Sequence, residues 1–202
     1  MATGISSSAI FRQFIADQLS GNVGGTGNAS FVSLNNASGF RVALYGAASN
    51  TQSVAPDKDA IAGSTGNVSN WGAASSAWTS GGSTAGAATS AAPEVYNTGW
   101  GQGGLGLGSP AVTPVAAGTG AAGSGIIMFD GADTASTTTT LSNVYGSLIY
   151  VASTASGTVP TATSTALLNR GVCYNYFGGA NGVTAGVLTV VWNNNGIFRI
   201  TV

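Results

Sequence analysis

The sequence predicts a mainly β protein, an antiparallel β-sandwich or barrel-like fold with one short N-terminal helix and a long insertion rich in Gly, Ala and Ser. Short runs of alternating apolar and polar residues recur from residue 40 to the last residue, and Gly, Asn and Thr separate them as turns. Only one segment has the periodicity of an amphipathic helix. At 202 residues, the chain fits a single β domain spanning 1–202.

The predicted helix covers about residues 6–20. Serines precede it as potential N-caps, and Gly21 follows it as a stop signal. Its apolar residues recur at helical spacing: Ile10, Phe11, Phe14 and Ile15. Such a stripe usually packs on a protein's own core, and the alternative is that it docks on a neighbouring subunit. We therefore treat these four residues as candidate interface residues.

An insertion at about 47–92 consists mostly of Ala, Ser, Gly, Thr and Asn, with few residues that could fill a core. Loops of this length inside a compact domain are usually functional or ordered by a partner. Trp71 and Trp78 lie within it. They are either anchors for a protein partner or side chains that fold back onto the parent domain, because Trp serves both uses.

Strand patterns occupy most of the remaining sequence. They cover Phe40–Tyr45, Glu94–Tyr96, Ile126–Phe129, Val144–Val151, Leu167–Phe177, Val183–Trp192 and Gly196–Val202. The last two are predicted to form a hairpin, since Asn195 and Gly196 supply the positive φ of a tight turn.

Charge is scarce, because five Lys or Arg and six Asp or Glu make up 5% of the residues, against about 25% in a typical soluble domain. A neutral polar surface of this kind associates readily, and the net charge of −1 opposes association little. No basic cluster is available for nucleic acid. No run of 18 apolar residues is present for a membrane span, and no secretory signal pattern begins the sequence, so we expect neither membrane insertion nor export.

The sequence contains no histidine, which excludes Ser-His-Asp and Cys-His catalysis and metal sites that contain histidine. The single cysteine, Cys173, lies in an apolar alternating segment and is predicted to be a buried free thiol. Arg170 is three residues away, so strand alternation places it on the opposite face, where it does not activate the thiol.

Two acidic pairs, Asp57 with Asp59 and Asp130 with Asp133, have the minimum spacing for a calcium site or a glycosidase-type acid pair. Neither has a full set of ligands, and turn residues that bond their own backbone are the favoured interpretation. The run Gly101–Gly106 fits the pattern G-x-G-x-x-G, but Pro110 follows closely and prevents the helix that a dinucleotide site requires. We therefore expect no cofactor, no metal and no catalytic residue.

Several landmarks occur in an order that resembles a family of small tailed-phage virion proteins. In that family a K-V-A-L-like strand precedes an N-E-V-x-G-x-G-Y-x-x-G-G-x-x-L segment. The matching pieces here are Phe40–Tyr45, an acidic turn near Asp57 and Asp59, Glu94–Trp100 with Gly103-Gly104-Leu105, Phe129-Asp130, Gly146–Tyr150, Tyr176–Gly179, Val191–Asn193 and Gly196–Ile200. The long insertion between about 60 and 92 departs from the family pattern. The resemblance implies a capsid-associated accessory subunit with a β-sandwich fold.

The sequence thus predicts a non-enzymatic virion protein, a capsid decoration or cement subunit assembled in the host cytoplasm. Its expected partners are the major capsid protein and neighbouring copies of itself, as a homo-oligomer on the particle. Shell contacts made only after assembly would stabilise the particle by mass action. One alternative is a tail or fibre component that binds a host receptor or carbohydrate through exposed Trp and Tyr. A polysaccharide hydrolase is the third, and six acids leave it few candidate pairs.

Overall fold

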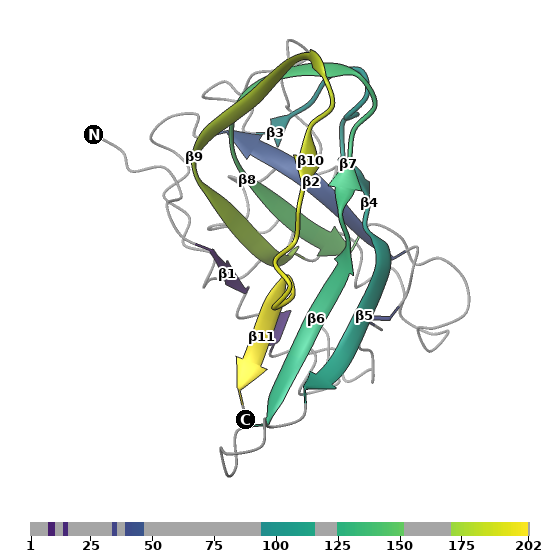
Figure 1. The fold of residues 1–202 in the computed structure, drawn as a ribbon, viewed down its shortest axis with the longest axis vertical. Coiled ribbons are helices and arrows are strands. Elements are labelled where there is room, and N and C mark those ends of the chain that lie inside the picture. Colours follow the sequence, from purple (N-terminus) through teal and green to yellow (C-terminus); the bar gives the residue numbers. More distant parts are fainter. Residues whose placement is uncertain are drawn as a thin grey trace, which may run out of the picture.

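The structure is a computed structural model. It describes residues 8–10, 14–15, 34–35, 39–46, 94–115, 125–151 and 171–201. These residues are mainly β and form antiparallel sheets, none of which closes into a barrel within the described ranges (Figure 1). The predicted mainly β, antiparallel character is therefore confirmed. The insertion predicted at about 47–92 lies outside the described residues, together with Phe11, Trp71 and Trp78.

The largest sheet has six strands in the order β1-β9-β8-β2-β3, and β4 pairs with β2 beside β3. Its strands are β1 (Ala9–Ile10), β2 (Phe40–Gly46), β3 (Glu94–Val95), β4 (Leu105–Gly106), β8 (Thr139–Val151) and β9 (Gly171–Gly186). β2 is central because β8 pairs with one of its sides along the full length, while β4 and then β3 pair with the other side. Its aromatic and aliphatic residues suit this doubly paired position.

A second sheet has the order β11-β6-β5, and two short strands, β10 and β7, form a third. The bounds are β5 (Gly108–Val115), β6 (Ile126–Ala132), β11 (Phe198–Thr201), β7 (Thr134–Ala135) and β10 (Thr189–Val190). Figure 1 shows β5, β6 and β11 side by side, with β7 continuing from the end of β6. β10 and β11 both run antiparallel to this continuous β6–β7 segment.

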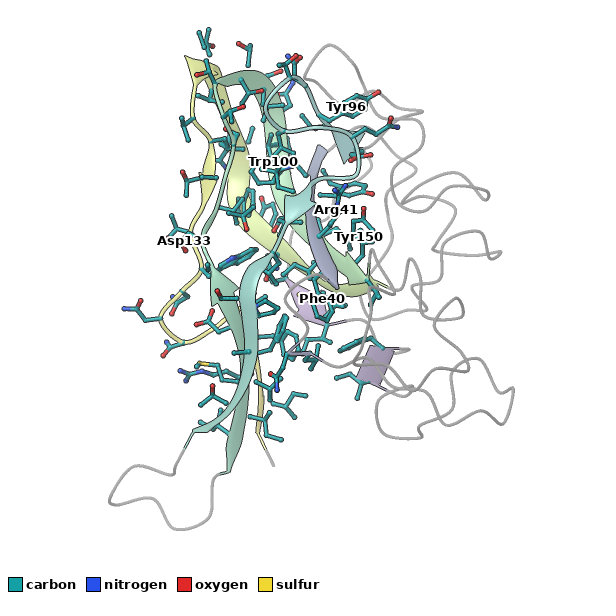
Figure 2. The ribbon with its side chains drawn as sticks, turned by 90° about the vertical axis from the view of Figure 1, so that its right-hand side faces the viewer. Phe40, Arg41, Tyr96, Trp100, Asp133 and Tyr150 are labelled. Atoms are coloured by element: carbon teal, nitrogen blue, oxygen red, sulfur yellow. The ribbon has the colours of Figure 1, made fainter. Side chains whose placement is uncertain are left out.

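Aromatic side chains connect the two larger sheets. The ring of Phe40 on β2 meets that of Phe129 on β6 edge-on, with centroids 5.7 Å apart, and Phe129 also packs on Phe198 of β11 at 5.1 Å. Such contacts add about 0.5–1.5 kcal/mol each to the free energy gained by burying the rings. On the opposite side of β2, Arg41 lies next to its cross-strand neighbour Tyr150 (Figure 2).

The N-terminal helix predicted at about 6–20 is replaced by a strand at two of its positions. Ala9 and Ile10 form β1, which pairs antiparallel with Tyr174 and Cys173 of β9. The helix prediction is wrong there, because an edge of β9 offers backbone hydrogen bonds that outweigh a weak local helix preference. Phe14 and Ile15 do have helical backbone conformation, as predicted. Apart from Ser8, the rest of that range lies outside the described residues.

The predicted hairpin of 183–192 with 196–202 is also wrong. The turn exists, since Gly196 has φ 85° and its N–H donates to the Asn193 carbonyl at 2.7 Å. The strands on either side of it do not pair with each other, because β10 pairs with β7 and β11 pairs with β6. Residues 191–197 connect β10 to β11 and lie opposite residues 130–133. They form a loop that is three residues longer than the segment it faces, and the chain keeps the same direction on both sides of it. Asn-Gly geometry fixes a turn but not the partner of the strand that follows.

A glycine is required where the loop before β4 crosses β2. Gly104 has φ 77°, and a Cβ placed on it would lie 2.0 Å from the carbonyl oxygen of Val42. The backbone of β2 is doubly paired and cannot move aside. Gly101, in the same loop, has open space instead, because a Cβ there would meet no atom within 4 Å.

Gly104→Ala should therefore destabilise the protein by roughly 2–4 kcal/mol, because both the positive φ and the clash with Val42 oppose a side chain. Gly101→Ala is the matched control and should change the free energy of unfolding by less than about 0.5 kcal/mol. Urea unfolding followed by tryptophan fluorescence measures both. Equal effects of the two substitutions would contradict the close approach.

Candidate functional site

The structure places the predicted interface residues in different environments. Phe14 is 3% exposed and belongs to the core, as the core-packing interpretation of the apolar stripe expects. Ile15 is half-buried. Ile10 is half-buried in β1 and lines a groove between β1, β9 and β11. Of the six candidates, only Ile10 is therefore found at a described surface hollow.

This groove has a volume of about 320 Å³. Its lining combines β1 with the last strand and includes Ser8, Ile10, Cys173, Asn175, Ile197 and Arg199. The backbone N–H of Tyr176 donates to the Ser8 hydroxyl at 2.9 Å, which holds β1 against β9. The walls of the groove belong to two different sheets, so it marks the junction between them.

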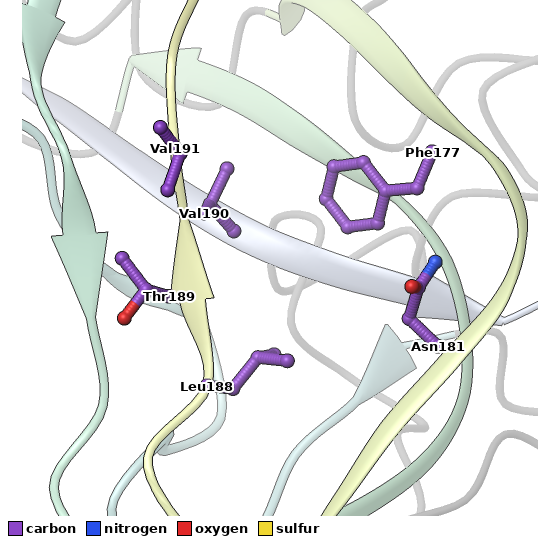
Figure 3. Close-up of a pocket in the computed structure, with 6 residues that line it drawn as sticks. All are labelled: Phe177, Asn181, Leu188, Thr189, Val190 and Val191. Carbon is purple, nitrogen blue, oxygen red and sulfur yellow. The ribbon is translucent and has the colours of Figure 1, made fainter.

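A second hollow, of about 150 Å³, lies where β9 faces the segment leading into β10. Figure 3 shows Phe177 and Asn181 on one side, with Leu188, Thr189, Val190 and Val191 on the other. Val191 is 69% exposed, and Val187, just before this segment, is 57% exposed. Exposed apolar side chains beside a surface hollow are typical of a protein contact site. We call Phe177, Val187, Leu188 and Val191 the β10 patch.

Hydrogen bonds from a loop residue hold the β10 patch in place. The Ser136 N–H donates to the Leu188 carbonyl at 2.9 Å, and the Leu188 N–H donates to the Ser136 hydroxyl at 2.8 Å. Nearby, the N–H of Ala185 donates to the Thr140 hydroxyl at 3.0 Å. Because the backbone is fixed by reciprocal bonds, the patch is preorganised, and binding would lose little conformational entropy. The sequence pattern does not predict these two hydrogen bonds, since Ser136 and Leu188 are far apart in the sequence.

The acidic pair Asp130 and Asp133 has a structural role. Asp130 lies within β6, and Asp133 follows it, where its Oδ1 accepts the backbone N–H of Trp192 at 2.9 Å. The indole N–H of Trp192 donates to the Ala132 carbonyl at 3.0 Å. The turn in which these acids bond their own backbone is therefore not formed, and Asp133 instead anchors the 191–197 loop. In the described ranges, no three residues of the types His, Cys, Asp and Glu gather as a metal site would require.

The glycine run Gly101–Gly106 forms a turn that enters a strand. The Gly104 N–H donates to the Gly101 carbonyl at 3.0 Å, and Leu105–Gly106 form β4. β5 begins shortly afterwards, at Gly108, so the helix of a dinucleotide site does not follow. At Gly104, the run instead permits a close approach to the backbone of β2.

The glycine turn covers a buried acid for which the sequence pattern gives no signal. Glu94 is 1% exposed, and its Oε1 accepts the Gly103 N–H at 2.6 Å. The hydroxyl of Tyr150 donates to the Gly103 carbonyl at 2.7 Å, which ties β8 to the same turn. Oε2 of Glu94 is buried without a hydrogen-bond partner among the described residues. Burial raises the pKa of Glu94 from its ordinary value of 4.5 to about 8, although the Gly103 hydrogen bond acts in the opposite direction.

Cys173 is a buried free thiol, as predicted. Burial raises its pKa to about 12, against the lowering effect of a hydrogen bond from Asn175. The thiolate required for nucleophilic chemistry is therefore scarce at neutral pH. Arg170 lies outside the described residues.

Comparisons with known proteins gave no relatives. No family model matches the chain, and no curated protein or solved structure is significantly similar to it. In the described part of the chain, no helix has the length and apolar character needed to cross a membrane.

The raised pKa of Glu94 predicts a pH-dependent stability. The folded protein retains a proton that the unfolded chain releases above pH 4.5, so the free energy of unfolding should be highest below that pH and fall as pH rises toward 8. The expected loss is roughly 3–5 kcal/mol. Glu94→Gln should remove most of this slope, because the amide stays neutral. Urea unfolding at pH 4.5, 6 and 8 measures it.

Asp133→Asn is the control, since it makes the same chemical change at an exposed acid and keeps an acceptor for Trp192. It should retain the wild-type slope. A wild-type stability that does not change between pH 4.5 and 8 would contradict the buried, protonated carboxyl group.

Proposed function

We propose that this chain is a non-enzymatic virion structural protein, a capsid decoration subunit that binds the major capsid protein and neighbouring copies of itself. The observation that carries the proposal is the β10 patch, where Val187 and Val191 are largely exposed beside a surface hollow. Because only 5% of the residues are charged, electrostatic repulsion between this patch and a protein partner is expected to be small. The sequence motifs that resemble small tailed-phage virion proteins are the reason for proposing a phage capsid as the particle to which the chain binds.

The sandwich that this family resemblance implies is part of the proposal. The Phe40–Phe129 contact between β2 and β6 supports two sheets that face each other across a shared core. A rigid two-layer body would present the β10 patch in a fixed orientation to a shell. Binding would then stabilise the shell by linkage, without a chemical step.

A non-enzymatic role agrees with the chemistry of the available side chains. The sequence has no histidine, Glu94 is buried under the glycine turn, and Asp133 is engaged by Trp192. A glycosidase would need two acids facing each other across a substrate cleft, and these engagements leave Glu94 and Asp133 unsuited to that task.

One observation favours the alternative of a tail or fibre component that binds carbohydrate. The β10 hollow combines the ring of Phe177 with the amide of Asn181 and the hydroxyl of Thr189. Sugars stack on aromatic rings and bond neighbouring amides. The hollow is small, and the strongly exposed side chains beside it, those of Val187 and Val191, are aliphatic, which is why we place protein contact first.

Val191→Asp should weaken binding to tailed-phage capsids that lack this chain by at least tenfold, because a charge would be buried against an apolar contact. Co-sedimentation of purified protein with such capsids measures the affinity. Thr113→Asp adds the same charge at an exposed position of β5 and should bind like wild type. Wild-type binding by Val191→Asp would exclude the β10 patch as the contact. Saccharide binding by a protein that does not attach to capsids would favour the alternative.

A further inference from the structure

The two edges of the β11-β6-β5 sheet differ in whether they can accept another strand. On β5, the backbone N–H of Val112 points away from β6 and donates to Oδ1 of Asn35 at 2.7 Å. Pro114, two residues later, has the same orientation and lacks an N–H, and Pro110 in the preceding bulge lacks one too. Every outward donor of β5 from residue 110 to 114 is thus absent or occupied, which is how natural proteins prevent edge pairing.

The opposite edge, on β11, has no such protection from any residue that the structure describes. Val112 and Phe129 are register partners, but they form a non-hydrogen-bonded pair, because the N–H of Val112 donates to Asn35. The backbone groups of Phe129 therefore point away from β5 and toward β11. Its carbonyl accepts the Ile197 N–H at 2.8 Å, and Phe198 is its register partner. Because backbone groups point to alternate sides along a strand, those of Ile200 point toward β6, and those of Arg199 and Thr201 point away from it, to the outer edge. Within the described residues, β11 pairs only with β6, so these outward groups have no strand beside them.

The open edge of β11 also carries apolar surface. Ile200 is half-buried and pairs with Ile127 of β6, which is 38% exposed. Both lie on the face that continues into the Phe129–Phe198 contact, because residues two apart on a strand share a face. The edge therefore offers backbone hydrogen bonds and an apolar face together, and the 320 Å³ groove runs beside its start.

The sequence of this edge is self-complementary. If two copies of β11 meet antiparallel about a two-fold axis at Ile200, the outward groups of Arg199 face those of Thr201 in the other copy. The two Ile200 side chains then form the close, non-hydrogen-bonded pair at the axis. No like charges oppose each other in this register. The guanidinium of Arg199 is held by the carbonyl and Oδ1 of Asn195 in its own chain, away from the axis.

We propose that two copies of this chain associate by antiparallel pairing of their β11 strands about Ile200, which makes one continuous six-stranded sheet from the two three-stranded sheets. The occupant of the open edge is thus a second copy. This inference rests on the proposed function for the expectation that neighbouring copies touch, and it assigns that contact to β11, whereas the β10 patch faces the shell.

Arg199→Pro tests the pairing, because it removes an outward N–H and leaves the inward bonds of β11 with β6 intact. Sedimentation equilibrium should show that the dimer dissociates at least tenfold more readily, since two intermolecular hydrogen bonds are lost. Arg199→Ala is the matched control, as it loses the same contacts with Asn195 but keeps the N–H. It should dimerise like wild type. Circular dichroism checks that each variant is folded.

Charge exchange at the axis provides a second test that does not depend on proline. Ile200→Lys and Ile200→Glu should each be monomeric, and an equimolar mixture should form the heterodimer, because opposite charges then face each other across the two strands. A wild-type chain that stays monomeric at millimolar concentration would overturn the inference, as would dimers of Arg199→Pro with wild-type affinity or a mixture that remains monomeric. Capsid binding by a monomeric Ile200→Lys protein would leave the proposed function standing, whereas dimers that never bind capsids would overturn only that function.

Discussion

The contact of Phe129 with both Phe40 and Phe198 determines how the rest of this structure is arranged. It joins the central strand of the six-stranded sheet to the middle and edge strands of the three-stranded sheet. The backbone groups of Phe129 are directed at β11, because its pair with Val112 of β5 is not hydrogen-bonded, and its carbonyl accepts the N–H of Ile197 at the end of the preceding loop. Phe129 thus joins the two sheets through its ring and pairs with β11 through its backbone.

A chain with so few charges has to place its polar groups differently from most soluble proteins. Reciprocal backbone and hydroxyl bonds, such as those between Ser136 and Leu188, replace surface ion pairs in fixing loops. The same strategy leaves buried oxygens without partners within the described residues, among them Oγ of Ser147 and Oε2 of Glu94. Neutral groups lose less free energy on such burial than charged ones, which explains why Glu94 retains its proton. Buried neutral groups and a nearly uncharged surface are thus two consequences of one composition.

The sequence predicts those elements whose pattern is set by burial, and fails where partners are chosen by tertiary contacts. Phe40, Val42 and Leu44 recur at strand spacing, and the segment forms β2 within one residue of the prediction. The pattern does not predict β5, because Pro110 and Pro114 normally argue against a strand, and only its edge position permits them. Helical spacing misassigns Ile10, since its pairing with β9 is remote in sequence. The β10 patch gives no signal, because Val191 and its neighbours look like ordinary strand residues.

The two outer edges of the smaller sheet show that protection from aggregation is local. Pro114 and the Asn35 side chain close β5 in a way that tolerates no partner, whereas within the described residues no strand covers Arg199 or Thr201 in β11. If association were merely a by-product of low charge, both edges would be expected to be equally open. A sheet closed on one side and open on the other can add one partner sheet and then stop, because the added copy presents its own closed β5 at the far end. Pairing through β11 therefore yields a finite dimer and not a fibre, as a two-fold, self-complementary contact requires.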